Sequence, residues 1–102
     1  MEQNPIPGAE GAILCPSGDV VADSEAELRA RLRVLVASGV RKLTIDLSHV
    51  QMMDSAGLGL LIAAHNSLRK SGGELAVIHA THDLLELFRT MRMHQHFSIS
   101  GE

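Results

Sequence analysis

Residues 43–78 show three successive hydrophobic patterns in the sequence "LTIDLSHVQMMDSAGLGLLIAAHNSLRKSGGELAVI". Leu43, Ile45 and Leu47 alternate with polar residues, which is the period of a half-buried strand. From Leu58 onward, apolar residues recur every three or four positions, as in an amphipathic helix, until "SGG" interrupts the pattern. The run "ELAVIHA" then indicates a second buried strand. This order predicts two parallel strands joined by a helix.

The flanking segments continue the alternation of strands and helices. "AILCPSGDVV", from residue 12, predicts an edge strand that runs into a turn. "DSEAELRARLRVLVASG" predicts a helix that starts at a capping box of Ser24 and Glu27 and ends at Gly39. "THDLLELFRTM" predicts a third helix and "HFSIS" a last strand. The inward residues predicted for the third helix are Leu84, Leu85, Phe88 and Met91.

These elements predict an α/β fold with a mostly parallel sheet of about four strands. The periodicity alone does not choose between helices on one face and helices on both faces. We expect a single domain over residues 12–102, preceded by a loosely ordered segment, 1–11, in which Pro5 and Pro7 disfavour a strand. A length of 102 residues suits one compact core.

Composition limits the classes of function. The chain is 45% hydrophobic and 21% charged, as in a globular protein, and its net charge is -3. Because the Lys and Arg residues are scattered along the sequence, nucleic acid and membrane surfaces are disfavoured as partners. Cys15 is the single cysteine, and the N-terminal residues do not resemble a signal peptide. We therefore expect a cytoplasmic protein.

Asp54 and Ser55 interrupt the apolar run where the central helix should begin. Both residue types are good N-caps, so the pair is explained simply as a helix cap. Gly57 and Gly59 should leave the first-turn amides and the Ser55 hydroxyl open. A phosphate on Ser55 would add about -1.5 to -2 charges at a position that the helix dipole favours. "DSAGLGLL" lacks the lysine of a phosphate-binding loop and the elbow of a serine hydrolase.

From residue 12 onward, the chain resembles the STAS domain, the fold of bacterial anti-sigma-factor antagonists. The resemblance rests on the Asp-Ser-Ala-Gly turn, the Gly-Leu-rich helix, the Gly-Gly stop and the segment "LLELFRTMRMHQHFSI". It implies helices mainly on one face of the sheet, no catalysis and no cofactor. Two departures are the absence of a predicted first strand and Val21, which stands where the family has an acidic residue.

The resemblance also implies a partner and a switch. A serine-kinase anti-sigma factor would bind the turn and phosphorylate Ser55, and a PP2C-type phosphatase would reverse this. The implied docking residues are Met52, Met53, Asp54, Ser55, Ala56, Gly57 and Leu58. One alternative is a non-signalling adaptor, such as the STAS subunit of a lipid transporter, that docks on an ABC ATPase. A further alternative is nucleotide binding at the helix start, although the missing lysine disfavours it.

Other polar and sulfur-containing residues predict no additional site. Six histidines include the pairs "HATH" and "HQH", but a metal site needs three or four convergent ligands, so we expect none. His65 should be partly buried and hydrogen-bonded. Cys15 should be a small buried hydrophobe rather than a redox centre. Of Met52 and Met53, at most one should face outward, because neighbouring side chains near a strand end point in opposite directions.

Overall fold

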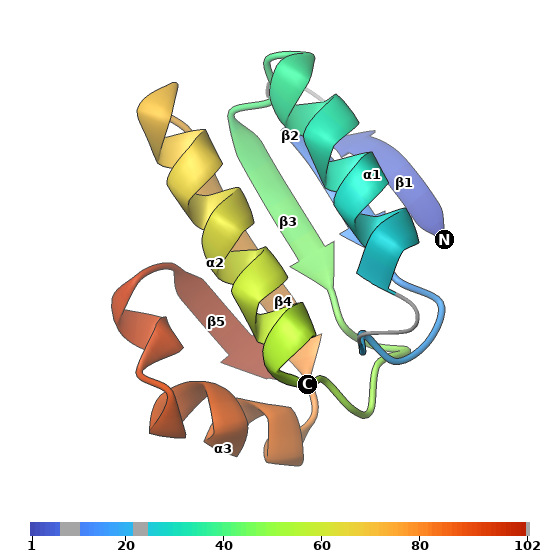
Figure 1. Cartoon of the computed structure of the whole chain (residues 1–102), viewed down its shortest axis with the longest axis vertical. Coiled ribbons are helices and arrows are strands. Elements are labelled where there is room, and N and C mark those ends of the chain that lie inside the picture. Colours follow the sequence, from blue (N-terminus) through green and yellow to red (C-terminus); the bar gives the residue numbers. More distant parts are fainter. Residues whose placement is uncertain (7–10, 22–24, 102) are drawn as a thin grey trace.

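The computed structural model describes residues 1–6, 11–21 and 25–101, and it alternates strands and helices after an opening pair of strands (Figure 1). The strands are β1 (Glu2–Ile6), β2 (Gly11–Cys15), β3 (Lys42–Asp46), β4 (Glu74–Ala80) and β5 (Ser98–Gly101). The helices are α1 (Glu25–Ala37), α2 (Ser55–Lys70) and α3 (His82–Thr90), and a short 3-10 turn, Met93–Gln95, precedes β5.

The strands form one sheet in the order β1-β2-β3-β4-β5. β1 and β2 are antiparallel, whereas β2, β3, β4 and β5 are parallel neighbours. One helix lies between each successive pair of parallel strands along the chain, since parallel pairing requires a long crossover connection. The predicted α/β fold with a mostly parallel sheet is confirmed, and the sheet has one strand more than the expected four.

The additional strand is β1, so the prediction that Pro5 and Pro7 prevent a first strand is wrong. β1 pairs with β2, and Pro5 lies opposite Ala12. Because β1 is at the edge of the sheet, one row of its backbone groups has no neighbouring strand, and such strands tolerate proline. The edge position beside β2 is taken by β1, so β2 is not the edge strand that the sequence predicted. Residues 7–10 lie outside the described residues.

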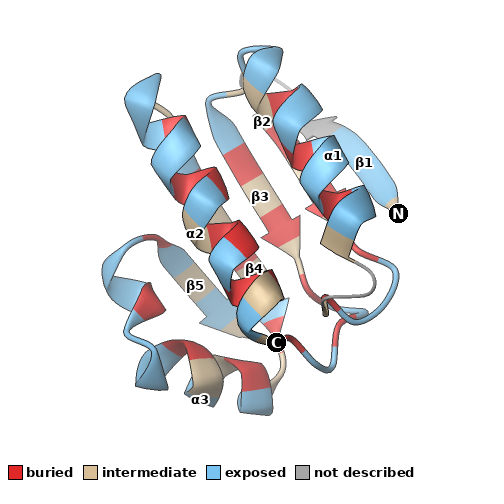
Figure 2. Cartoon of the chain, in the orientation of Figure 1, coloured by how far each residue is buried: buried red, intermediate tan, exposed pale blue. Residues whose placement is uncertain are grey.

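The core forms where α1 and α2 cover one face of the sheet. Leu43 pairs with Leu75, and Ile45 pairs with Val77, so these side chains share a face of β3 and β4. All four are buried. α1 and α2 lie in front of the sheet in Figure 1, with buried positions along both helices in Figure 2. This is the arrangement that the STAS resemblance implies, and α3 lies near the carboxyl ends of β4 and β5.

α1 follows its predicted pattern at the inward face and at its end. Leu28, Leu32 and Leu35 are buried. Gly39 has a φ of +89°, the left-handed conformation expected after a helix. The predicted cap, Ser24, lies outside the described residues. Within the described residues, no helix has both the length and the hydropathy needed to cross a bilayer.

α3 departs from its predicted inward face at one position. Leu84 and Phe88 are buried as predicted, but Met91 is 55% exposed. The helix ends one residue before Met91, and Arg92 then adopts a left-handed φ of +57°. The chain changes direction at this point, so Met93 is buried in place of Met91.

Candidate functional site

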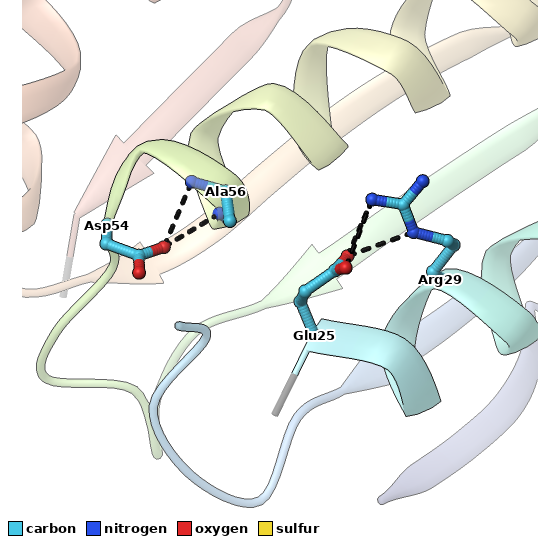
Figure 3. A network of polar contacts seen from close by, with 5 residues as sticks. Glu25, Arg29, Asp54 and Ala56 are labelled. Atoms are coloured by element: carbon cyan, nitrogen blue, oxygen red, sulfur yellow. Dashed lines mark hydrogen bonds and ion pairs between the residues drawn. The ribbon is translucent and has the colours of Figure 1, made fainter. Parts of the chain in front are cut away.

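The turn between β3 and α2 places Asp54 and Ser55 at the start of α2. The helix begins at Ser55, and Asp54 is its N-cap, with an extended backbone at φ -99° and ψ -173°. The Asp54 Oδ1 atom accepts hydrogen bonds from the backbone N–H groups of Ala56 at 3.0 Å and Gly57 at 3.1 Å (Figure 3). The capping role that the sequence offered to either residue therefore belongs to Asp54.

Ser55 occupies the first helical position and is exposed. Its side chain takes no part in the cap, which uses the Asp54 carboxylate. The simple interpretation of this pair as a helix cap thus explains Asp54 and not Ser55. The exposed Ser55 side chain is therefore not one of the groups that cap α2.

The expectation that the first-turn amides lie open is wrong. The amides of Ala56 and Gly57 donate to Asp54, and the amide of Leu58 donates to the Asp54 carbonyl at 2.9 Å. Gly57 is also buried, and a Cβ there would collide with the Val20 carbonyl oxygen. These amides are therefore not available to a nucleotide phosphate, which weakens the proposal of direct nucleotide binding at this turn.

The seven implied docking residues divide by exposure. Met52 is 61% exposed, whereas Met53 is 5% exposed, which confirms that at most one of them faces outward. The accessible group consists of Met52 and Ser55, with Asp54 and Ala56 half-buried. The buried group consists of Met53, Gly57 and Leu58. Met52 and Ser55 thus present the most surface at the turn, whereas Met53, Gly57 and Leu58 lie beneath it in the free chain.

Asp19 holds this turn from a distant part of the sequence, and sequence reasoning missed it. Its Oδ1 atom accepts hydrogen bonds from the backbone N–H groups of Gln51 and Met52, both at 3.0 Å. The next residue, Val20, donates its N–H to the Met52 carbonyl at 3.1 Å and forms a parallel bridge with Met53. The sequence signal that could have revealed this contact is the Gly18–Asp19 pair, which is typical of a turn. Loops that follow two neighbouring parallel strands meet at the same edge of the sheet, so this turn could be expected to lie beside the one after β3.

The two histidines of the "HATH" segment, His79 and His82, each lie close to a carboxylate. His79 Nδ1 lies 3.0 Å from Asp46 Oδ1, and His82 Nε2 lies 3.1 Å from Glu86 Oε1. Burial raises the pKa of Asp46, but hydrogen bonds from Ser48 and His79 outweigh it, and the pKa lies below its ordinary value. Over residues 1–6, 11–21 and 25–101, no group of three or more His, Cys, Asp or Glu side chains could hold a metal ion.

His65 is more deeply buried than the partly buried side chain that was predicted, and the predicted hydrogen bond is absent at its Nδ1 atom within the described residues. Its ring lies 5.5 Å from that of Phe97 and 6.1 Å from that of His96, between centroids. Its Nδ1 atom is buried and has no hydrogen-bond partner among the described residues. Burial lowers the pKa of His65, and the neighbouring Arg69 guanidinium acts in the same direction. Protonation of the imidazole is therefore disfavoured in the folded protein.

Cys15 meets its expectation only in part, because it is half-buried rather than buried. Burial raises the pKa of its thiol, and the charge of Asp46 acts in the same direction. The thiolate, which is the reactive form, is disfavoured at this site. Cys15 therefore lacks the electrostatic environment typical of redox cysteines.

A family model described as "Mlab, STAS domain" matches residues 10–99, which is most of the chain. The chain belongs to the STAS domain family. The anti-sigma-B factor antagonist of Listeria monocytogenes is 33% identical to it over 72 residues, covering 71% of this chain and 63% of that relative. This STAS chain thus spans less than two thirds of the length of the relative that it matches.

Two solved structures share this STAS fold. A proposed anti-sigma factor antagonist from Thermotoga maritima superimposes with a TM-score of 0.90 at 18% identity, over 99% of this chain and 86% of that chain. The phosphorylated form of the Bacillus cell fate determinant SpoIIAA superimposes with a TM-score of 0.72 at 15% identity, over 95% of this chain and 88% of that chain. At such identities, the likeness is one of fold.

Proposed function

We propose that this STAS domain is an anti-sigma-factor antagonist that binds a serine-kinase anti-sigma factor through the turn at Asp54 and Ser55. Phosphorylation of Ser55 by that kinase would release the partner, and a PP2C-type phosphatase would restore binding. Such a cycle would take place in the cytoplasm. The observation that supports this best is that the two residues of the turn have different roles: Asp54 caps α2, and Ser55 is exposed.

The electrostatics of the turn suit a switch that changes the surface and preserves the fold. A phosphate on Ser55 would add about -1.5 to -2 charges, and the positive end of the α2 dipole would stabilise them. Asp54 and Asp19 contribute carboxylates to the same turn, so the phosphorylated surface becomes strongly acidic. Met52, exposed beside the turn, supplies the adaptable apolar contact for the partner in the unphosphorylated state.

Binding by two Ser55 variants tests the switch. Ser55→Ala should bind the anti-sigma factor as the parent chain does, whereas Ser55→Asp should weaken binding by about tenfold or more, equivalent to roughly 1.4 kcal/mol. Isothermal titration calorimetry with the purified anti-sigma factor measures both affinities. Ser55→Asp should melt no lower than Ser55→Ala, because position 55 is not part of the cap and the α2 dipole favours a negative charge there.

Asn66→Asp provides the matched control for Ser55→Asp. Asn66 is exposed on the same helix, about three turns from Ser55, and its replacement makes the same change in net charge. Equal affinities of Ser55→Ala and Ser55→Asp would contradict the proposal. Equal losses in Ser55→Asp and Asn66→Asp would also contradict it, since they would trace the effect to net charge rather than to the turn.

A second candidate function is a non-signalling adaptor that docks permanently on an ABC ATPase. Val21 favours it, because this residue replaces an acidic residue of the antagonist pattern and is half-buried beside the turn. In that case, the chain should co-purify with an ABC ATPase and not with a serine kinase. The complex should also be insensitive to Ser55→Asp.

A further inference from the structure

The fold gathers basic residues that are scattered in the sequence. Five of the nine Lys and Arg residues lie in the second half of α1, at the amino end of β3 or in the last turn of α2. These segments meet at one end of the molecule, at the top of Figure 1. The residues are Arg33, Arg41, Lys42, Arg69 and Lys70. Among the described residues, Glu74 is the acidic residue at this end, and its carboxylate lies 3.6 Å from Lys42 Nζ.

A groove of about 370 Å³ lies between α1 and α2 and extends toward this basic end. Its floor is apolar, with Leu32, Leu60 and Ala64 buried. Its rim carries small exposed side chains, including Ala37 and Ala63. Each helix presents lining residues three or four positions apart over two turns, a length of about 11 Å. The groove is therefore long enough for two turns of a third helix. The small residues on its rim would let that helix approach closely.

Arginines form the polar wall of the groove. Arg29 lines it and is held by an ion pair with Glu25 at 2.9 Å, which is drawn in Figure 3. Arg33 lines it one turn further along α1 and is exposed. The lining contains no acidic side chain among the described residues. A segment that enters the groove therefore meets apolar contacts at its centre and guanidinium groups at its side.

We propose that this groove binds an amphipathic helix of a partner protein that carries carboxylates beside its apolar stripe. The apolar floor takes the hydrophobic side chains at helical spacing, and Arg33 pairs with the carboxylates. A nucleic acid would leave this floor unfilled, because phosphates and sugars supply no apolar stripe. The site lies along α1 and α2 and does not include Ser55, so it is independent of the proposed phosphorylation switch.

Binding of two synthetic peptides tests the proposal. Both form amphipathic helices with the same leucine stripe, and Glu flanks the stripe in one peptide, whereas Lys flanks it in the other. By fluorescence anisotropy, the Glu peptide should bind and the Lys peptide should bind at least about tenfold more weakly. Arg33→Glu and Ala63→Leu, which fills the groove, should each weaken the Glu peptide about tenfold or more.

Two exposed residues of α1 outside the groove lining supply matched controls, Arg31→Glu for charge and Ala30→Leu for size. Both should leave the affinity within about twofold, since isolated surface charges contribute little. Circular dichroism verifies that each variant is folded, and Ser55→Asp should leave peptide binding unchanged. Equal binding of both peptides, no binding of the Glu peptide, or equal losses in Arg33→Glu and Arg31→Glu would overturn the proposal. Tighter binding to phosphatidylglycerol vesicles, lost equally in both arginine variants, would also overturn it.

Discussion

Two adjacent side chains with similar capping propensities have different roles in this structure. Asp54 accepts two backbone hydrogen bonds, while Ser55 begins the helix and stays exposed. The sequence could not assign the roles, because the assignment depends on which residue keeps an extended backbone. Asp19 and Val20 bond to residues 51–54 from another loop and fix where the extended segment ends. The choice of cap is thus a tertiary effect.

The cap predicts a difference between two substitutions of Asp54. Asp54→Ala should lower the free energy of unfolding by about 0.5–2 kcal/mol, because the amides of Ala56 and Gly57 lose their acceptor. Asp54→Asn should retain most of the stability, since asparagine is a comparable N-cap. Urea denaturation at neutral pH measures both variants. Equal stability of Asp54→Ala and the parent chain would mean that the cap contributes nothing.

His65 predicts a specific pH dependence of stability. Its pKa is lowered in the fold, so the unfolded chain binds more protons as the pH falls below its ordinary value of about 6.5. Stability from the neutral imidazole is therefore present above that pH and is lost on acidification. Asp46, whose pKa is also lowered, loses its contribution in a separate window, below the ordinary carboxylate pKa of about 4.

His65→Leu should remove the loss of stability that begins as the pH falls below about 6.5, while leaving the loss below the ordinary carboxylate pKa of about 4. It also replaces the buried Nδ1 atom, which has no hydrogen-bond partner among the described residues, with an apolar group. Melting temperatures across this pH range measure the effect, and His49→Gln, at an exposed position, is the control. An unchanged slope in His65→Leu would show that another group is responsible.

At the level of elements, the start of α2 packs against the loop that follows β2. Gly57 allows this contact, because any side chain there would meet the Val20 carbonyl oxygen and the Met53 side chain. Gly59 faces open space two residues later. The sequence presented both glycines as equivalent openings in the first turn. They differ because only Gly57 lies on the helix face toward that loop.

This difference predicts opposite effects of the same substitution. Gly57→Ala should destabilise the fold by about 1–3 kcal/mol through overpacking. Gly59→Ala should stabilise it by about 0.5–1 kcal/mol, because alanine loses less backbone entropy in a helix. Chemical denaturation of both variants provides the comparison. A stabilising Gly57→Ala would show that the loop after β2 moves away from α2 at little cost.

The elements that could be predicted from the sequence are those with strong local patterns. β3, α2 and β4 follow the periodicity of residues 43–78, and α1 follows its buried leucines. β1 could not be predicted, because its five residues have no hydrophobic alternation and include Pro5. Its stability depends on pairing with β2, which is a tertiary contact. Met91 was misplaced for a similar reason, since the left-handed Arg92 follows it.

At the level of the whole molecule, the parallel topology sorts functional groups to opposite ends. The turns after β2 and β3 meet at one end, where Asp19, Asp54 and Ser55 lie together. The ends of α1 and α2 meet at the other, which collects most of the basic residues. Sequence spacing alone suggested scattered Lys and Arg residues, because it contains no information about which turns become neighbours. The two partner surfaces that we propose therefore lie on different parts of the fold.

The central claim is that Ser55 is the switch of this STAS domain. The most direct measurement incubates the chain with ATP and a serine-kinase anti-sigma factor that binds it, followed by phosphosite mapping by mass spectrometry. We predict a single phosphate on Ser55, and none on Ser55→Ala under the same conditions. Phosphorylation at another residue, or no modification of a chain that binds the kinase, would contradict the account.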